Sequence, residues 1–141
     1  MTSPSISVPA GFAPACAVGY SDSGGGLALV SGATPLPVAM SAPAPAPLSG
    51  LSTVSAVAGP FVPTPGRVIV VTLDGEWDGT VRLLRSTDGG LTKARLRVGG
   101  GTWGEYTASG CEQAWTETEE GTSFYLDIAL NSGAVAYRVS Q

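Results

Sequence analysis

The chain has 141 residues, a net charge of −4 and no histidine. This length suits one domain with a modest core. The acidic balance argues against nucleic acid as the main partner, because phosphate binding needs clustered cations. Without histidine, neither a Ser-His or Cys-His nucleophile pair nor an imidazole metal site can form. We therefore expect no enzymatic activity, no catalytic residues, no metal and no cofactor.

Membrane insertion and disulfide bonding are not predicted either. The least polar stretches consist of small residues interrupted by proline, which cannot form a lipid-facing helix. Residues 1–12 contain two prolines and no Lys or Arg, so a secretory signal peptide is not expected. Cys16 and Cys111 share no short spacing, which favours two independent thiols over a disulfide framework or a thiolate metal cluster.

Charge divides the chain near Arg67. Before this residue only Asp22 is charged, and all eleven prolines lie there. Arg67 is the first of the seven Lys and Arg residues, and the other ten of the eleven acids follow it. The pattern predicts an extended Pro/Ala/Gly-rich N-terminal arm over residues 1–59 and a compact β-domain over residues 60–141.

The arm is expected to become ordered by lying on a neighbouring protein. Residues 42–47 alternate Ala and Pro, which favours extended polyproline II backbone. Residues 24–26 are three glycines that indicate a flexible break, and residues 27–30 can pair as a short strand. Ala, Pro and Gly bury too little area to offset the entropy of ordering them. A solvated linker is the alternative, but such linkers usually carry more charge.

The second part of the chain predicts an all-β domain. Its first β-branched run ends at the turn signal Asp74-Gly75, and Ser109-Gly110, Glu120-Gly121 and residues 131–133 offer further turns. About seven short strands without a convincing helix indicate an antiparallel β-sandwich or a small barrel. The expected strands cover residues 67–73, 80–85, 91–98, 102–107, 112–118, 123–130 and 134–139.

Alternation along these runs predicts the core. Apolar residues that recur every second position share one face of a strand. The expected core residues are Phe124, Leu126, Ile128, Leu130, Val135, Tyr137 and Val139. We interpret the three tryptophans, Trp77, Trp103 and Trp115, as core or sheet-packing residues rather than as a ligand platform, because aromatic area is normally used in this way.

Two groups of acids are candidates for a cation site or a glycosidase-like acid pair. One group is Glu117, Glu119 and Glu120 near a turn, and the other is Asp74, Glu76 and Asp78, which alternate around Trp77. The calcium-loop pattern of an EF-hand is absent. A solvated loop rich in acids is therefore the preferred interpretation of both.

Residues 86–92, Ser-Thr-Asp-Gly-Gly-Leu-Thr, look like the Asp-box hairpin of sialidases and many β-repeat proteins. In that turn the aspartate caps the backbone. Lys93 stands where the usual aromatic residue follows, and the motif occurs once. The Asp-box is a folding device in those families, so the resemblance implies no glycosidase activity.

A wider resemblance covers most of residues 60–141 and, more loosely, the leader. Its segments are residues 79–81, 86–90, 119–121, 125–126 and 132–141, together with the Thr-Pro-Leu-Pro-Val run at residues 34–38. In this order they resemble a small β-domain of structural proteins from tailed bacteriophages and prophages. The resemblance implies a virion component and carries over no catalytic residues.

The expected function is therefore that of a phage virion structural protein, most naturally a capsid decoration or head-fibre protein attached through its N-terminal arm. The expected partners are capsid or other virion proteins and further copies of the chain, with a trimer as one natural oligomer. Nucleic acid and membrane are not expected partners. Two alternatives remain: a tail or baseplate adsorption component with glycan contacts at Trp77 or Trp103, and a secreted carbohydrate-binding module.

Overall fold

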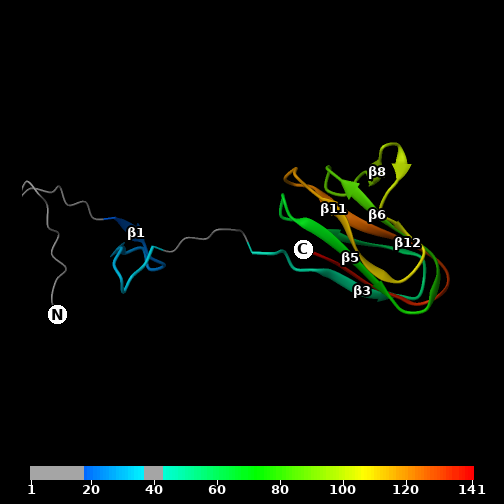
Figure 1. Ribbon diagram of the computed structural model, residues 1–141, viewed down its shortest axis with the longest axis horizontal. Helices are drawn as coiled ribbons and strands as arrows, with labels where there is room; N and C mark the ends of the chain where they lie inside the picture. The colour runs from blue at the N-terminus through cyan, green and yellow to red at the C-terminus, as the bar shows by residue number, and fades with distance from the viewer. Residues whose placement is uncertain (1–17, 37–42) are drawn as a thin grey trace, which may run out of the picture. The chain divides into compact units, whose positions relative to one another are not determined.

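A computed structural model describes residues 18–36 and 43–141 (Figure 1). The parts of the predicted arm at residues 1–17 and 37–42 lie outside the described residues. The chain divides into two compact units, Met1–Ser41 and Ala42–Gln141. The first is called the N-terminal unit and the second the β-domain. The described residues contain no helix long and apolar enough to span a membrane.

The described part of the N-terminal unit is a small hairpin, here called the N-terminal hairpin (residues 18–36). Its strands β1 (Gly19–Ser21) and β2 (Leu27–Leu29) pair antiparallel. The Asp22 carboxylate accepts the backbone N–H groups of Gly24 and Gly26 at 2.9 and 2.8 Å. The expected strand at residues 27–30 is thus confirmed for Leu27–Leu29, whereas the three glycines expected as a flexible break form a capped turn.

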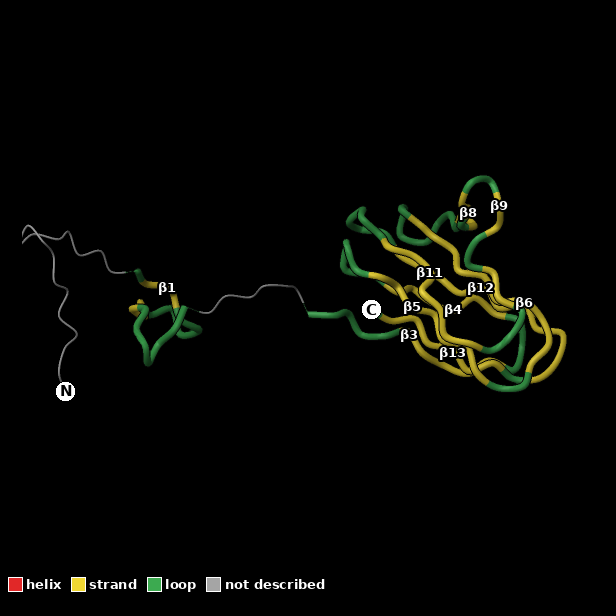
Figure 2. The backbone as a smooth tube through the Cα atoms, viewed as in Figure 1, coloured by secondary structure: helices red, strands yellow, loops and turns green. Residues whose placement is uncertain are grey.

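The β-domain is built from antiparallel sheets and is not closed into a barrel. Its strands are β3 (Leu48–Ser52), β4 (Ala56–Phe61), β5 (Val68–Asp74), β6 (Trp77–Ser86), β7 (Ala94–Arg95), β8 (Arg97–Val98), β9 (Gly101–Thr102), β10 (Glu105–Tyr106), β11 (Gly110–Thr116), β12 (Ser123–Gly133) and β13 (Val135–Ser140). A five-stranded sheet has the order β10–β6–β12–β4, with β7 also paired to β6, and a four-stranded sheet has the order β11–β5–β13–β3. Figure 2 shows these layers and the small β8–β9 hairpin that projects from them.

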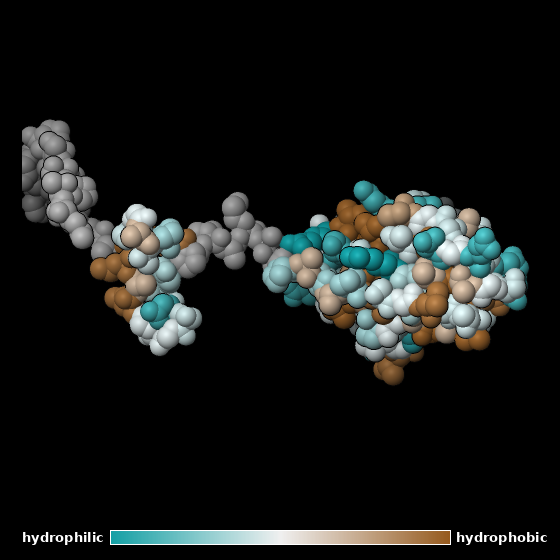
Figure 3. All heavy atoms as spheres, turned by 90° about the horizontal axis from the view of Figure 1, so that it is seen from below, coloured by the Kyte–Doolittle hydropathy of each residue, from teal (hydrophilic) through white to brown (hydrophobic). Residues whose placement is uncertain are grey.

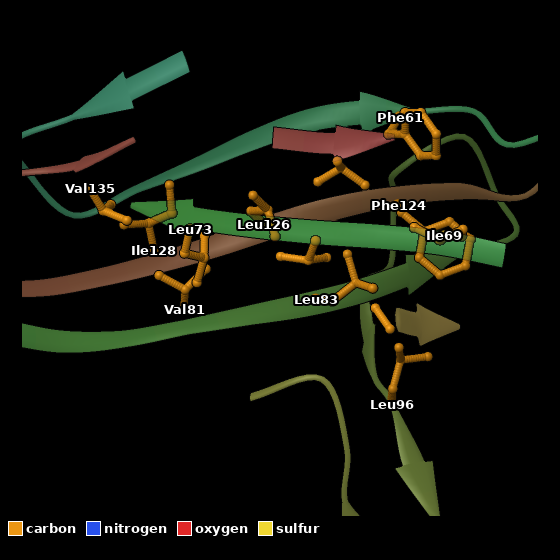
Figure 4. Close-up of a cluster of buried hydrophobic side chains, with 13 residues drawn as sticks. Phe61, Ile69, Leu73, Val81, Leu83, Leu96, Phe124, Leu126, Ile128 and Val135 are labelled. Atoms are coloured by element: carbon orange, nitrogen blue, oxygen red, sulfur yellow. The ribbon is translucent and has the colours of Figure 1, made fainter. Parts of the chain in front are cut away.

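The core lies between the two main sheets (Figure 4). Phe124, Leu126 and Ile128 of β12 are at most 2 % exposed, because alternate residues of a pleated strand face the same side. Val135 and Val139 of β13 are also buried. Leu130 and Tyr137 are partly buried and pack against this cluster. The predicted core is confirmed.

The β-domain begins earlier than the boundary expected at residues 59 and 60. Strand β3 pairs with β13 and β4 pairs with β12, so each main sheet takes one edge strand from the predicted arm. Phe61 at the end of β4 is 2 % exposed and belongs to the core. The composition of residues 48–61 did not indicate these strands, because strands pair through backbone groups that nearly all residue types have. Pro60 is tolerated because β4 is an edge strand.

Two expected elements differ from the structure. The turn expected at residues 131–133 lies inside β12, which continues to pair with β6 as far as Gly133 opposite Trp77. The strand expected over residues 91–98 is divided, since β7 pairs with β6 while β8 pairs with β9. Leu96 between them is 4 % exposed. Its side chain belongs to the core. The chain pairs with β6 before this residue and with β9 after it.

Candidate functional site

Arg85 and Glu117 connect the two main sheets. Arg85 is paired in register with the buried Phe124, so it shares the core-facing side of the sheet, whereas Glu117 directly follows β11 of the other sheet. Arg85 Nε and Nη2 donate to the two carboxylate oxygens of Glu117 at 2.6 and 3.1 Å. This is a bidentate pair. The pair links the two sheets, and both carboxylate oxygens of Glu117 accept hydrogen bonds from Arg85.

The surroundings of Glu117 stabilise its charge. The Arg85 guanidinium and the backbone N–H groups of Thr118 and Glu119 hold the pKa of Glu117 below its usual range, although burial opposes them. Arg85 Nη2 also donates to Glu119 Oε2 at 2.6 Å. The expectation of a solvated acidic loop is wrong for Glu117, which is 3 % exposed, while Glu119 and Glu120 are on the surface.

Two of the acids around Trp77 accept hydrogen bonds, one from the adjacent backbone and one from a side chain of β12. Asp74 Oδ1 accepts the N–H of Gly75 at 2.7 Å, and Asp78 Oδ2 accepts the side-chain amide of Asn131 at 2.9 Å. Glu76 is exposed. Within residues 18–36 and 43–141, no group of three or more His, Cys, Asp or Glu side chains is placed to hold a metal ion.

In the turn of residues 86–92 the aspartate caps the backbone, as the sequence indicates. Asp88 accepts the backbone N–H of Thr92 at 2.9 Å and also bonds the hydroxyl of Thr92. Ser86 Oγ accepts the N–H of Gly90 at 2.9 Å. The bonds from Thr92, followed by that from Ser86, hold the pKa of Asp88 well below its usual range. All of these hydrogen bonds join groups within residues 86–92.

Lys93 covers an aromatic ring beside this turn. Its Nζ lies 4.7 Å from the centroid of the Tyr125 ring and donates to the carbonyl oxygen of Gly90 at 2.6 Å. A Cβ at Gly90, where φ is +93°, would overlap the hydroxyl of Tyr125. The lysine thus takes part in a cation–π contact at the end of the turn.

The three tryptophans have different environments. Trp77 packs against the core, and its Nε1 donates to Ser109 Oγ at 3.1 Å. Trp115 also packs against the core. Trp103 is 45 % exposed. The packing interpretation is confirmed for Trp77 and Trp115, whereas Trp103 offers a large aromatic surface to solvent.

Trp103 and Trp115 line an open hollow of about 290 Å³, here called the tryptophan groove. Val68 and Val98 add apolar walls, and Gln113 adds an amide. The volume is just below the range of small-molecule sites, roughly 300–1,000 Å³. The groove therefore combines two indole rings with few polar groups.

A second hollow of about 180 Å³, here called the acidic hollow, also borders Trp103. Glu105, Tyr106 and Glu112 line it. Arg82 Nε donates to Glu105 Oε2 at 2.6 Å and thereby orients that carboxylate. Burial and the charge of Glu112 raise the pKa of Tyr106 from 10 to about 12. Its hydroxyl, like that of an ordinary tyrosine, is protonated at neutral pH.

The N-terminal hairpin presents a different surface, which is apolar and almost uncharged. Leu27 is 77 % exposed and Leu29 is 56 % exposed, with Val18, Val30 and Leu36 also exposed. Figure 3 shows hydrophobic side chains gathered on the surface of this unit. A two-stranded hairpin alone is marginally stable in water.

Several of these residues escaped the sequence analysis. The contact between Arg85 and Glu117 joins residues 32 positions apart, and Glu105 and Glu112 lie on different strands. No local pattern relates such positions. The exposure of Trp103 had one available signal, the neighbouring glycines at residues 99–101 and 104, which leave little side-chain volume to cover the ring.

No protein-family model, curated protein sequence or solved structure matches this chain.

Proposed function

We propose that this protein is a structural component of a phage-type virion, a capsid decoration or head-fibre protein that attaches through its N-terminal unit and displays its β-domain. The observation that carries the proposal is the N-terminal hairpin with its exposed Leu27 and Leu29. Such a hairpin gains stability by laying its apolar side chains on another surface.

The distribution of charge supports the same division of labour. Only Asp22 is charged before Arg67, and its carboxylate is occupied by the turn of the hairpin. An apolar attachment segment loses no solvated charge when it is covered. The β-domain carries the remaining charges, which suits a part that faces solvent.

Repetition on a particle would strengthen a weak attachment. Burying a single Leu side chain contributes about 1.5–3 kcal/mol, and several copies held together gain avidity. A homo-oligomer, for which a trimer is a natural choice, therefore fits the proposal. The partners in this proposal are capsid or other virion proteins and further copies of this chain.

Cosedimentation with particles tests the attachment. Tagged full-length chain, the chain of residues 42–141 and the Leu27→Asp variant are each mixed with particles from a lysate that lacks the native protein. We expect the full chain to cosediment and residues 42–141 to stay in the supernatant. Leu27→Asp should bind about tenfold more weakly, because it places a charge where attachment would bury a leucine that is exposed in the free chain.

The matched control is Leu91→Asp, which places the same charge on the β-domain at a leucine that is 87 % exposed. This variant should bind particles as the unaltered chain does. Undiminished cosedimentation of residues 42–141 would contradict attachment through the N-terminal unit. Imaging the tagged full chain on the particle separates decoration of the head from the alternative, a tail or baseplate component.

A further inference from the structure

We propose that the tryptophan groove and the acidic hollow together form a binding site for a neutral glycan, with Trp103 as its stacking platform. Trp103 and Gln113 line both hollows, so the apolar and polar halves of the site adjoin at these two residues. This proposal goes beyond attachment, because the site lies in the β-domain and not in the N-terminal unit.

Trp103 is held firmly although it is exposed. Its Nε1 donates to the carbonyl oxygen of Ala114 at 2.6 Å, and its backbone N–H donates to the carbonyl oxygen of Leu96 at 3.1 Å. The next residue, Gly104, accepts the N–H of Leu83 at 2.8 Å. A ring fixed in this way loses little further entropy when a ligand stacks on it.

The polar groups of the acidic hollow match the hydroxyls of a sugar. Glu105 and Glu112 are acceptors, and a carboxylate forms charge-assisted hydrogen bonds with hydroxyl donors. The protonated Tyr106 hydroxyl can donate as well as accept. A pyranose presents an apolar C–H face and a rim of hydroxyls, which correspond to the indole rings of the groove and the carboxylates of the hollow.

Charge narrows the ligand class further. Two carboxylates beside the platform disfavour uronic acids, sialic acids and sulfated sugars, because like charges across an interface weaken binding. The neighbouring Arg82 is already paired with Glu105. The ligand expected from these groups is therefore an uncharged hexose or N-acetylhexosamine polymer.

A proline-rich peptide is the competing occupant, since such peptides dock on aromatic-lined grooves and residues 42–47 of this chain alternate Ala and Pro. Proline lacks a backbone N–H, so such a peptide offers mainly carbonyl acceptors. The Trp103 N–H that would meet a carbonyl is already bound to Ala114. The carboxylates of the hollow are acceptors too, which favours a hydroxyl-bearing ligand.

Affinity electrophoresis of the full chain tests the site. Native gels contain cellulose ether, xylan, mannan, galactan or soluble chitin as neutral probes, and polygalacturonate or polysialic acid as anionic probes. We expect at least one neutral polymer to retard the chain and neither anionic polymer to do so. Retardation by no neutral polymer, or by an anionic polymer alone, would overturn the proposal.

Variants locate the binding on the protein. Trp103→Ala should weaken retardation by the neutral polymer at least about tenfold through loss of stacking, and Glu112→Gln should weaken it about threefold or more through loss of a charged acceptor. Leu91→Ala, which removes an exposed apolar side chain outside both hollows, should have no effect. Circular dichroism establishes that each variant is folded.

If Trp103→Ala fails to fold, Glu112→Gln and Trp103→Phe decide the outcome, with Trp103→Phe retaining part of the binding. Retardation that is unchanged in all folded variants of the groove and hollow would refute the site. A synthetic peptide of residues 41–50 that shifts the Trp103 Nε1–H resonance, when no neutral polymer does, would assign the groove to the proline-rich leader instead. None of these results affects the attachment proposal, which rests on the other unit.

Discussion

Individual side chains in this protein make contacts that their neighbouring residues in the sequence do not specify. Lys93 follows the turn of residues 86–92, and its ammonium group lies over the Tyr125 ring. An ammonium group at 4.7 Å from the ring centroid is attracted to the negative face of the ring. Lys93 is thereby held beside the turn both by this ring contact and by its hydrogen bond to the carbonyl oxygen of Gly90.

Arg85 provides the residue-scale test of stability. We expect Arg85→Leu to lower the free energy of unfolding by about 2 kcal/mol at neutral pH, because it leaves the Glu117 carboxylate, whose side chain is 4 % exposed, without its cation. Urea denaturation measures this change. The matched control is Arg82→Leu, which breaks the more exposed pair with Glu105 and should cost under about 1 kcal/mol.

The pH dependence of the same variant follows from Glu117. Its pKa in the folded protein is lowered from the ordinary value of 4.5, so the stability it contributes is present above that value and is lost as pH falls through the folded pKa. The difference between the unaltered chain and Arg85→Leu should therefore shrink below about pH 4.5. A difference that stays constant down to pH 2 would show that Glu117 is not the partner that matters.

Among the elements, the long pair β6 and β12 is the centre of the five-stranded sheet. The pairing continues across a register shift between Leu130 and Ser132. Gly79 lies opposite Leu130 with φ of +148°, and a Cβ there would overlap the backbone of Ala129. The irregularity thus depends on a residue without a side chain.

The element-scale test is Gly79→Ala. We expect it to lower the free energy of unfolding by roughly 2 kcal/mol, through backbone strain and the close approach of Ala129. Gly110→Ala is the control, because Gly110 is not among the glycines with positive φ and a Cβ there would meet open space. Equal midpoints of denaturation for the two variants would contradict the close approach inferred at Gly79.

At the scale of the whole molecule, the boundary between the units decides which fragment folds. Strands β3 and β4 lie before residue 62 and form one edge of each main sheet. A cut after residue 59 removes β3 and four of the six residues of β4, whereas a cut after residue 41 leaves both sheets complete.

We therefore expect the fragment of residues 42–141 to unfold cooperatively with a denaturation midpoint within experimental error of that of the full chain. The fragment of residues 60–141 should be strongly destabilised or aggregate, because it loses two paired strands and exposes the edges of β12 and β13. Circular dichroism and size-exclusion chromatography of both fragments make the comparison. Equal stability of the two would remove β3 and β4 from the required fold.

Local pattern in the sequence determined the all-β class, the turn at Asp74-Gly75 and the core face of β12. Strand periodicity and turn preference depend on neighbouring residues, so they can be read along the chain. The separation of an uncharged leader from a charged domain was visible for the same reason, since composition is a local property.

Only the tertiary structure decided which strands complete the sheets, how Arg85 meets Glu117 and why Trp103 stays exposed. Pairing of β3 with β13 joins residues more than 80 positions apart, and it is made by backbone groups that nearly every residue type supplies. The two hollows beside Trp103 likewise depend on where β10 and β11 come to rest around it. Contacts between segments distant in sequence depend on packing of the whole domain, so no window of neighbouring residues contains them.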